Sequence, residues 1–155
     1  MSSKYWIFAF LFFIIIPFYK EESKEDVTVI NELSYRYTSG YEINSDVSYD
    51  IICDKKCRVS IKPYGKSEEE AITKTLSTSQ VDELRSILVK YNIVSWDGFK
   101  KTDKDVLDGD SFSFYLKYND DETVSASGYM MWPSRYRDFQ KEFEGLFNEN
   151  YNKER

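Results

Sequence analysis

Histidine is absent from this 155-residue chain, and cysteine occurs only twice, at Cys53 and Cys57. Histidine is the commonest general base, the commonest zinc ligand and the usual partner of a nucleophilic serine or cysteine. Any catalysis would therefore depend on carboxylates, lysine, tyrosine or a metal. The sequence also has no phosphate-binding loop and no internal repeat, which argues against P-loop enzymes and solenoids. We expect neither a cofactor nor enzymatic activity.

Positive charge is in the minority. The chain has 21 basic and 27 acidic side chains, and residues 1–20 contain only Lys4 and Lys20. Residues 21–155 therefore hold 19 basic side chains against 27 acidic ones, a net charge of −8. Such a surface repels phosphate backbones, so nucleic acid is not expected as a partner.

The N-terminus carries a membrane-targeting segment. Residues 5–19 are uncharged and mostly apolar, and they follow Lys4. As a helix they would span roughly 22 Å, less than the ~30 Å hydrocarbon core, which favours a signal peptide. Against cleavage, the bulky and charged residues 17–22 offer no pair of small residues for a signal peptidase. Both a membrane anchor and a cleaved signal therefore stay open.

The charges on either side of this segment predict its orientation. Lys4 precedes it, and acidic residues follow it from Glu21 onward, which places the N-terminus in the cytoplasm and the domain outside. We expect a single-pass membrane protein, or a secreted one after cleavage. The chain then divides into a signal or anchor (residues 1–20), a polar stalk (21–26) and a single domain (27–151).

Alternation of apolar and polar residues predicts strands, and a period of 3.6 predicts helices. Strands are expected over residues 27–37, 47–53, 57–61 and 71–76, with a central hairpin formed by residues 111–118 and 123–129. One helix is expected from a cap at Thr78 or Ser79 to Asn92, and another from Pro133 to Phe147, while residues 93–96 lead back into the sheet region. This order predicts an α+β fold in which two amphipathic helices cover one face of an antiparallel sheet. The other face would meet water, and the hydrophobic N-terminal helix would precede the domain.

The two cysteines are predicted to form a disulfide. Cys53 continues the face of the second strand, and Cys57 begins the same face of the third, across a three-residue link. Directly opposed residues of antiparallel strands lie roughly 4.5–5.5 Å apart at Cα, within the range that a disulfide tolerates. A redox-active dithiol and a metal pair are the alternatives, but the spacing and the absence of histidine do not favour them.

An acidic loop is the candidate for a cation site. Asp103, Asp105, Asp108 and Asp110 lie close together, and oxygen-rich loops bind calcium when their ligands have the correct register. With Asp108 as the fifth ligand, lysine and valine occupy places that require carboxylates. A solvated loop with turn-forming aspartates is therefore the preferred interpretation, and cation binding by residues 103–110 stays open.

Serine or carboxylate chemistry is the enzymatic alternative. The serines at 111, 113, 125 and 127 alternate along the central hairpin, where the water-facing side of a sheet is the ordinary expectation. A nucleophilic serine needs an adjacent base, and only lysine or a carboxylate is available. Paired acids such as Asp97 and Asp108 would be needed for a glycosidase-type reaction. No spacing distinguishes such a pair, so a carboxylate- or metal-dependent hydrolase of envelope material remains the alternative function.

Aromatic side chains are abundant, and 19 of them lie beyond residue 20. Tyrosine and tryptophan are frequent in surfaces that bind sugars and proteins because they offer large area at low entropy cost. Trp96, Tyr129 and Trp132 are the candidate partner surface. The competing interpretation, which we favour for the two tryptophans, is that they close the ends of the core.

Four short runs of the sequence resemble a known but uncharacterised domain of bacterial membrane-anchored or secreted proteins and lipoproteins. They are Trp96-Asp97-Gly98-Phe99, Val106-Leu107-Asp108-Gly109, Ser111-Phe112-Ser113 and Ser125-Ala126-Ser127-Gly128-Tyr129. The resemblance covers about half of the chain. It implies a bacterial source and export, and it supplies no catalytic residue. One departure is that no cysteine near the N-terminus is available to carry a lipid.

The sequence therefore favours a non-catalytic binding or structural domain outside the cytoplasm, at the bacterial cell envelope. The membrane would be contacted through residues 5–19, and the further partner would be an envelope protein or glycan. A structural subunit of a membrane assembly is a third possibility.

Overall fold

The computed structural model of this chain describes residues 26–41, 46–63, 66–119 and 121–148. The expected signal or anchor (1–20), the stalk up to residue 25 and the expected end of the domain (149–151) lie outside the described residues. Within those ranges, no helix combines the length and apolarity needed to cross a membrane.

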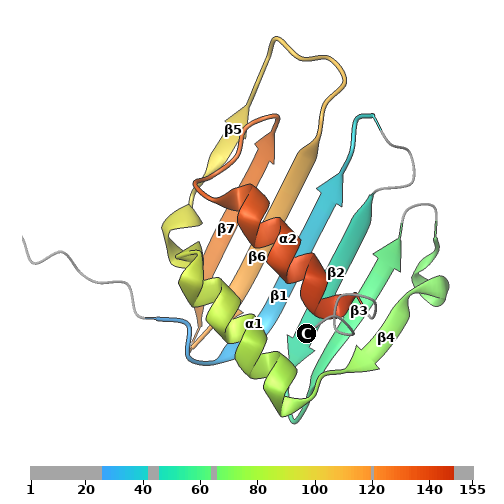
Figure 1. The fold of residues 1–155 in the computed structure, drawn as a ribbon, viewed down its shortest axis with the longest axis vertical. Coiled ribbons are helices and arrows are strands. Elements are labelled where there is room, and N and C mark those ends of the chain that lie inside the picture. Colours follow the sequence, from blue (N-terminus) through green and yellow to red (C-terminus); the bar gives the residue numbers. More distant parts are fainter. Residues whose placement is uncertain (1–25, 42–45, 64–65, 120, 149–155) are drawn as a thin grey trace, which may run out of the picture.

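Seven strands form one sheet in the order β4-β3-β2-β1-β6-β7-β5 (Figure 1). Every neighbouring pair is antiparallel except β5 and β7, which run parallel. The predicted α+β class is confirmed, and the sheet is mixed where a purely antiparallel one was expected. The strands are β1 (Ile30–Thr38), β2 (Val47–Cys53), β3 (Cys57–Pro63), β4 (Ile72–Thr75), β5 (Lys100–Thr102), β6 (Ser111–Tyr118) and β7 (Glu122–Tyr129).

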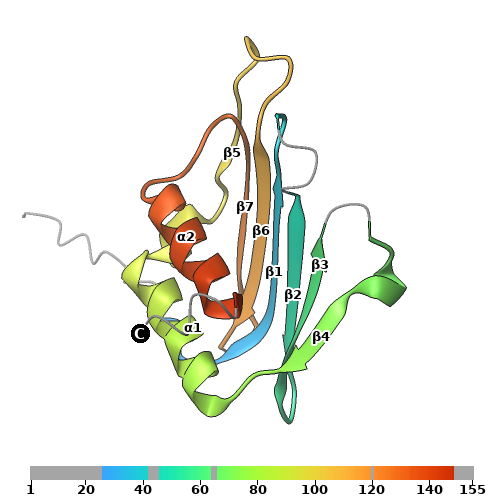
Figure 2. The same cartoon turned by 45° about the vertical axis from the view of Figure 1, so that its right-hand side comes forward.

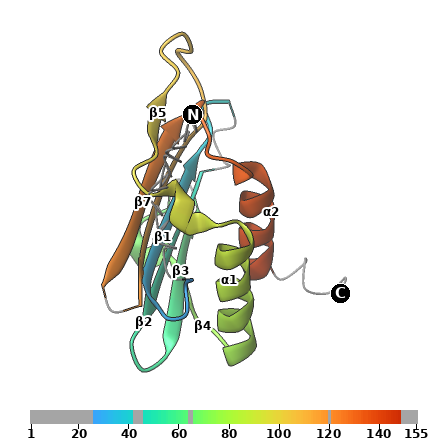
Figure 3. The same ribbon diagram turned by 90° about the vertical axis from the view of Figure 1, so that its left-hand side faces the viewer.

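Two helices, α1 (Thr78–Lys90) and α2 (Tyr136–Phe147), pack on the same face of the sheet (Figures 2 and 3). Two short 3₁₀ helices, η1 (Glu68–Glu70) and η2 (Ile93–Trp96), complete the described elements. Among the described residues, Figure 3 shows no helix on the opposite face of the sheet. The predicted layer of two helices on one face is therefore confirmed, and the opposite face is called the open face below.

The core between sheet and helices is largely aromatic. Trp96 is at its centre, with ring centroids 5.8 Å from Phe114 and 5.1 Å from Phe139. Phe139 in turn contacts the ring of Tyr35 edge-on at 5.9 Å. The hydroxyl groups of Tyr35 and Tyr136 are 2.9 Å apart, so each buried phenol has a hydrogen-bond partner. Edge-to-face ring packing and paired hydroxyls let so many aromatic rings share one interior.

The hairpin predictions are confirmed in register as well as in position. In β6 and β7, Phe112 lies opposite Gly128 and Phe114 opposite Ala126, and all four face the helices. At the far end of the sheet, Cys53 and Cys57 are directly opposed and joined by a disulfide, with their Cα atoms 4.0 Å apart. The short β2–β3 connection is therefore covalently closed where the alternation predicted it.

Four local predictions need correction. The cap of α1 is Ser77, one residue earlier than predicted, and it forms a capping box with Gln80. The second helix begins at Tyr136, not at Pro133, after Arg135 adopts a left-handed conformation. Residues 93–96 turn into η2 beneath the sheet and do not join it. The parallel strand β5 was not predicted, because its three residues are all polar and exposed.

Candidate binding site

The three aromatic residues predicted to form a partner surface do not lie together. Trp96 is only 2% exposed and belongs to the core, which corrects its assignment to the surface. Trp132 is half-buried on the helix side, where its ring stacks on Tyr136 at 4.7 Å. Tyr129 is opposite Ser111 and points by alternation to the open face. The preferred interpretation was that the two tryptophans close the ends of the core. Trp96 does belong to the core but lies at its centre, and Trp132 is only partly buried.

Trp132 is further covered by a cation. The guanidinium carbon of Arg137 lies 4.3 Å from its ring centroid, a distance typical of cation–π contact. With Tyr136 stacked on the ring as well, little of either ring face is left for a sugar. This arrangement makes Trp132 a poor stacking platform and a good anchor for the start of α2.

The acidic loop does not assemble into a metal site. Asp105 and Asp108 are exposed, and Asp103 accepts a hydrogen bond from the backbone of Asp105 within the loop. No group of three or more acidic, cysteine or histidine side chains converges anywhere in the described ranges. The carboxylates of this loop are spread toward solvent, as a turn-forming loop requires.

Asp110 behaves differently from the other acids of its loop. Its carboxylate accepts hydrogen bonds from the hydroxyl of Tyr37 at 2.8 Å and from Arg137 at 3.3 Å. It also accepts from the Ser39 hydroxyl at 3.3 Å and from the Gly40 amide at 3.2 Å. One side chain thus ties the end of β1 and the following turn to the first turn of α2.

This network fixes the charge of Asp110. Partial burial opposes ionisation, but the hydrogen bonds from Tyr37, Gly40, Arg137 and Ser39 together lower the pKa of its carboxyl group. Burial and the bond to the carboxylate raise the pKa of Tyr37. An acid held ionised by four donors has no proton to give as a general acid, and its hydrogen bonds hold the end of β1 and the following turn to α2.

The open face is polar across its width. The serines that alternate along β6 and β7 lie on it, as predicted, because Phe112, Val124 and their neighbours take the helix face. The pairing registers place further hydroxyl groups and cations beside them, in a continuous row of directly opposed residues. The row runs Lys100, Ser127, Ser113, Arg36, Ser48, Lys62.

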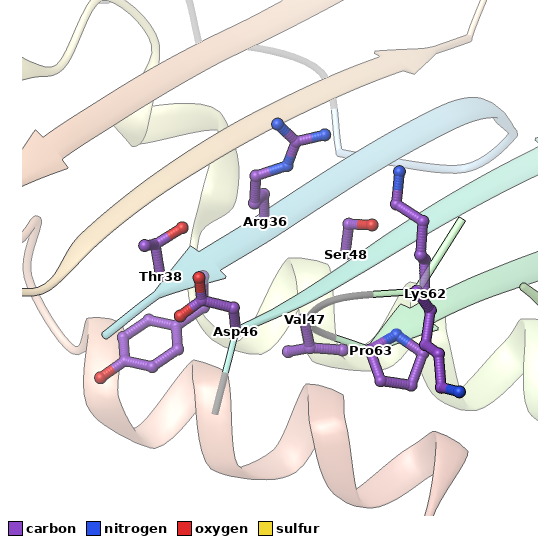
Figure 4. A pocket seen from close by; sticks show the side chains of 9 residues that line it. Arg36, Thr38, Asp46, Val47, Ser48, Lys62 and Pro63 are labelled. Carbon is purple, nitrogen blue, oxygen red and sulfur yellow. The ribbon is translucent and has the colours of Figure 1, made fainter. Parts of the chain in front are cut away.

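A cleft opens where this row crosses the ends of β1, β2 and β3. Its volume is about 260 Å³, and its lining includes Arg36, Ser48, Lys62 and Asp46. Figure 4 shows Arg36, Ser48 and Lys62 on the same side of the sheet, with Ser48 between the two cations. Ser48 is 5% exposed, and its hydroxyl has no hydrogen-bond partner in the part of the chain that the structure describes.

Neither this cleft nor the role of Asp110 was predicted. Arg36, Ser48 and Lys62 are far apart in the sequence and belong to three strands, so only the pairing registers bring them together. One signal was available in the sequence. Arg36 and Ser48 each stand next to a tyrosine of the buried face, so the alternation of the strands places both on the open face.

Comparison with protein-family models and with curated proteins finds no match for this chain.

Proposed function

We propose that this chain is a non-catalytic binding domain displayed outside the membrane of a bacterium, and that its open face binds a protein or glycan of the cell envelope. The observation that carries the proposal is the sheet face that no helix of the described residues covers, with its row of serines between cations. The export reading and the bacterial source come from the sequence of residues 1–26 and from the resemblance described above.

The chemistry of the open face suits a polar partner. Serine hydroxyl groups both donate and accept hydrogen bonds, and Arg36 and the lysines donate only. Tyr115 lies half-buried in the neighbouring row, between Ser34 and Ser125, and offers an aromatic surface at the centre of the face. A polar face with one central aromatic ring resembles the composition of binding surfaces more than that of a core.

The state of the acids supports binding over the hydrolase alternative. A hydrolase of the predicted kind needs a carboxyl group whose pKa is raised so that it retains a proton. Among residues 103–110, Asp110 has a lowered pKa and four hydrogen-bond donors, and a carboxyl group whose pKa is raised, that of Glu144, lies on α2, on the helix face of the sheet.

Site-specific crosslinking in the native membrane tests the proposal. A photo-reactive amino acid replaces Tyr115 on the open face, and in the matched control it replaces Asp138, which is exposed on α2. We expect adducts with an envelope protein or glycan from position 115 and few or none from position 138. Equal labelling from both positions, or none from position 115, would contradict the proposal.

The location is tested separately. Protease added to intact cells, or to spheroplasts where an outer membrane is present, should remove the domain from residue 21 onward if the anchor is retained. A domain found free in the medium with a new N-terminus near residues 17–24 would instead support the secreted form. Full protection in the cytosol would refute export.

A further inference from the structure

We propose that the cleft between Arg36, Ser48 and Lys62 is an oxyanion site that receives a phosphate group. The three residues come from three adjacent strands, with Arg36 directly opposite Ser48 and Ser48 directly opposite Lys62. Opposed residues of antiparallel strands are roughly 4.5–5.5 Å apart at Cα, so both cations can reach one small anion held above the serine.

The hydroxyl of Ser48 is the first independent observation. Buried polar side chains nearly always have a hydrogen-bond partner, and those that lack one require an explanation. Ser48 is 95% buried and its Oγ has none among the described residues. Because it lines the cleft beside two cations, an anionic oxygen is the partner that this hydroxyl is placed to bind.

Charge is the second observation. No hydrogen bond or ion pair of the Arg36 guanidinium is present within the described residues, although the chain has more acids than bases. Lys62 and Lys66 also line the cleft, and both have partners of their own: Lys66 is paired to Glu70 at 2.9 Å, and Lys62 takes part in another interaction. The acid of the lining, Asp46, directs one oxygen to the Ser39 amide at 2.8 Å. The guanidinium fork therefore has donors available for an oxyanion.

Size and openness restrict the ligand. The cleft volume of about 260 Å³ is below the roughly 300–1,000 Å³ of pockets that enclose a whole ligand. A single phosphate group fits, with the remainder of a larger molecule lying along the open face. The inference deepens the proposed function, and it rests on that function only for the source of the phosphate.

Calorimetric titration of the full chain in detergent tests the site at constant ionic strength. Inorganic phosphate and methyl phosphate are the probes, and sodium acetate is the comparison. We expect saturable phosphate binding that Arg36→Gln and Lys62→Gln each weaken by about tenfold, while Lys55→Gln, in the exposed β2–β3 turn, leaves it unchanged. Tighter binding of methyl phosphate identifies a phosphate ester as the natural group, and tighter binding of inorganic phosphate identifies the free ion.

Absence of saturable binding for both phosphates overturns the inference, as does equal weakening by Lys55→Gln or equal affinity for acetate. Ser48→Ala separates binding from folding. If the hydroxyl serves the anion, this variant binds phosphate several-fold more weakly and unfolds at an unchanged or higher temperature. If it serves the fold, the melting temperature falls and phosphate affinity is unchanged, which overturns the role of Ser48.

The two proposals fail separately. Crosslinks from position 115 without phosphate binding would leave the open face as a binding surface and remove the oxyanion site. Phosphate binding without crosslinks would keep the oxyanion site and remove the envelope partner.

Discussion

The two faces of this sheet are made by the same strands and have opposite properties. Along β1, Leu33 and Tyr35 are buried under the helices, while Ser34 and Arg36 between them lie on the open face. The helix face is held by interlocked aromatic rings, so a change of volume there disturbs many neighbours. The open face is held mainly by backbone pairing, so a change to one of its side chains disturbs fewer neighbours. Stability and the proposed binding are thus assigned to alternate residues.

The largest expected difference between the two faces is in the free energy of unfolding that is lost when a side chain is shortened to alanine. Phe139→Ala removes a ring that contacts Trp96, Tyr35 and Phe114, and we expect it to lower the free energy of unfolding by about 3–5 kcal/mol. Ser113→Ala, exposed on the open face, should change it by less than about 0.5 kcal/mol. Urea unfolding measures both. Similar losses in the two variants would show that the open face is also structural.

The next largest effect is expected at Asp110, which joins the end of β1 and the following turn to α2. Asp110→Ala removes the acceptor of four hydrogen bonds and should cost about 2–3 kcal/mol, whereas Asp108→Ala, exposed in the same loop, should cost almost nothing. Because the folded pKa of Asp110 is lowered, its stabilisation is present above the usual aspartate range. It is lost as the pH falls through the folded pKa, so the two variants should converge in acid. A constant difference at all pH values would assign the effect to packing.

The disulfide should have a somewhat smaller effect. The bond closes only a short loop, so replacing Cys53 and Cys57 together by serine should cost about 2 kcal/mol, and the protein should still fold. Intact mass with and without alkylation, on material exported by the native route, reports the state of the thiols. Two free thiols in that material would contradict the predicted bond. A chain that fails to fold after the double substitution would show that this hairpin matters more than its loop length implies.

The smallest effect is expected at Glu144, on the inner side of α2. Burial raises the pKa of this carboxyl group, while a hydrogen bond from Gln140 partly opposes the shift. A raised pKa means that the charged form costs stability, a cost that appears as the pH rises through the folded pKa. Glu144→Gln should therefore raise the melting temperature slightly at neutral pH and show no gain below the usual glutamate range. A lower melting temperature at pH 7 would show that the charge has a favourable partner.

The elements with strong periodicity could be predicted from the sequence. Phe112 to Tyr118 alternate without interruption, and the positions of Cys53 and Cys57 follow from the strands on either side. In contrast, β5 consists of Lys100, Lys101 and Thr102, which show no alternation and pair through their backbone with β7. A strand of this kind depends on tertiary context, which local propensity does not contain.

The candidate site was less predictable for a related reason. Trp96 was a candidate for a partner surface because its residue type suits one, although the core was the preferred interpretation, and its central place in the core depends on η2 turning beneath the sheet. The cleft depends on which residues of three strands lie opposite one another, and a shift of one residue would move them to the other face. The acids of residues 103–110 looked alike in sequence, and Asp110 is distinguished by hydrogen bonds from Tyr37, from the turn at Ser39 and Gly40, and from Arg137, which are distant in the sequence.

The central place of β1 has a consequence for the order in which the chain folds. This first strand is paired on one side with β2 and on the other with β6, so Tyr35 lies opposite both Tyr49 and Phe114. Strands β1 to β4 can pair with their neighbours in sequence as they are synthesised. The pairing of β1 with β6 requires closure of a long loop, which costs conformational entropy, so we expect it to form later. A chain interrupted before residue 111 would present the whole length of β1 as an unpaired edge. Truncated or slowly folding forms should therefore aggregate through that strand, whereas in the folded sheet β1 is paired on both sides.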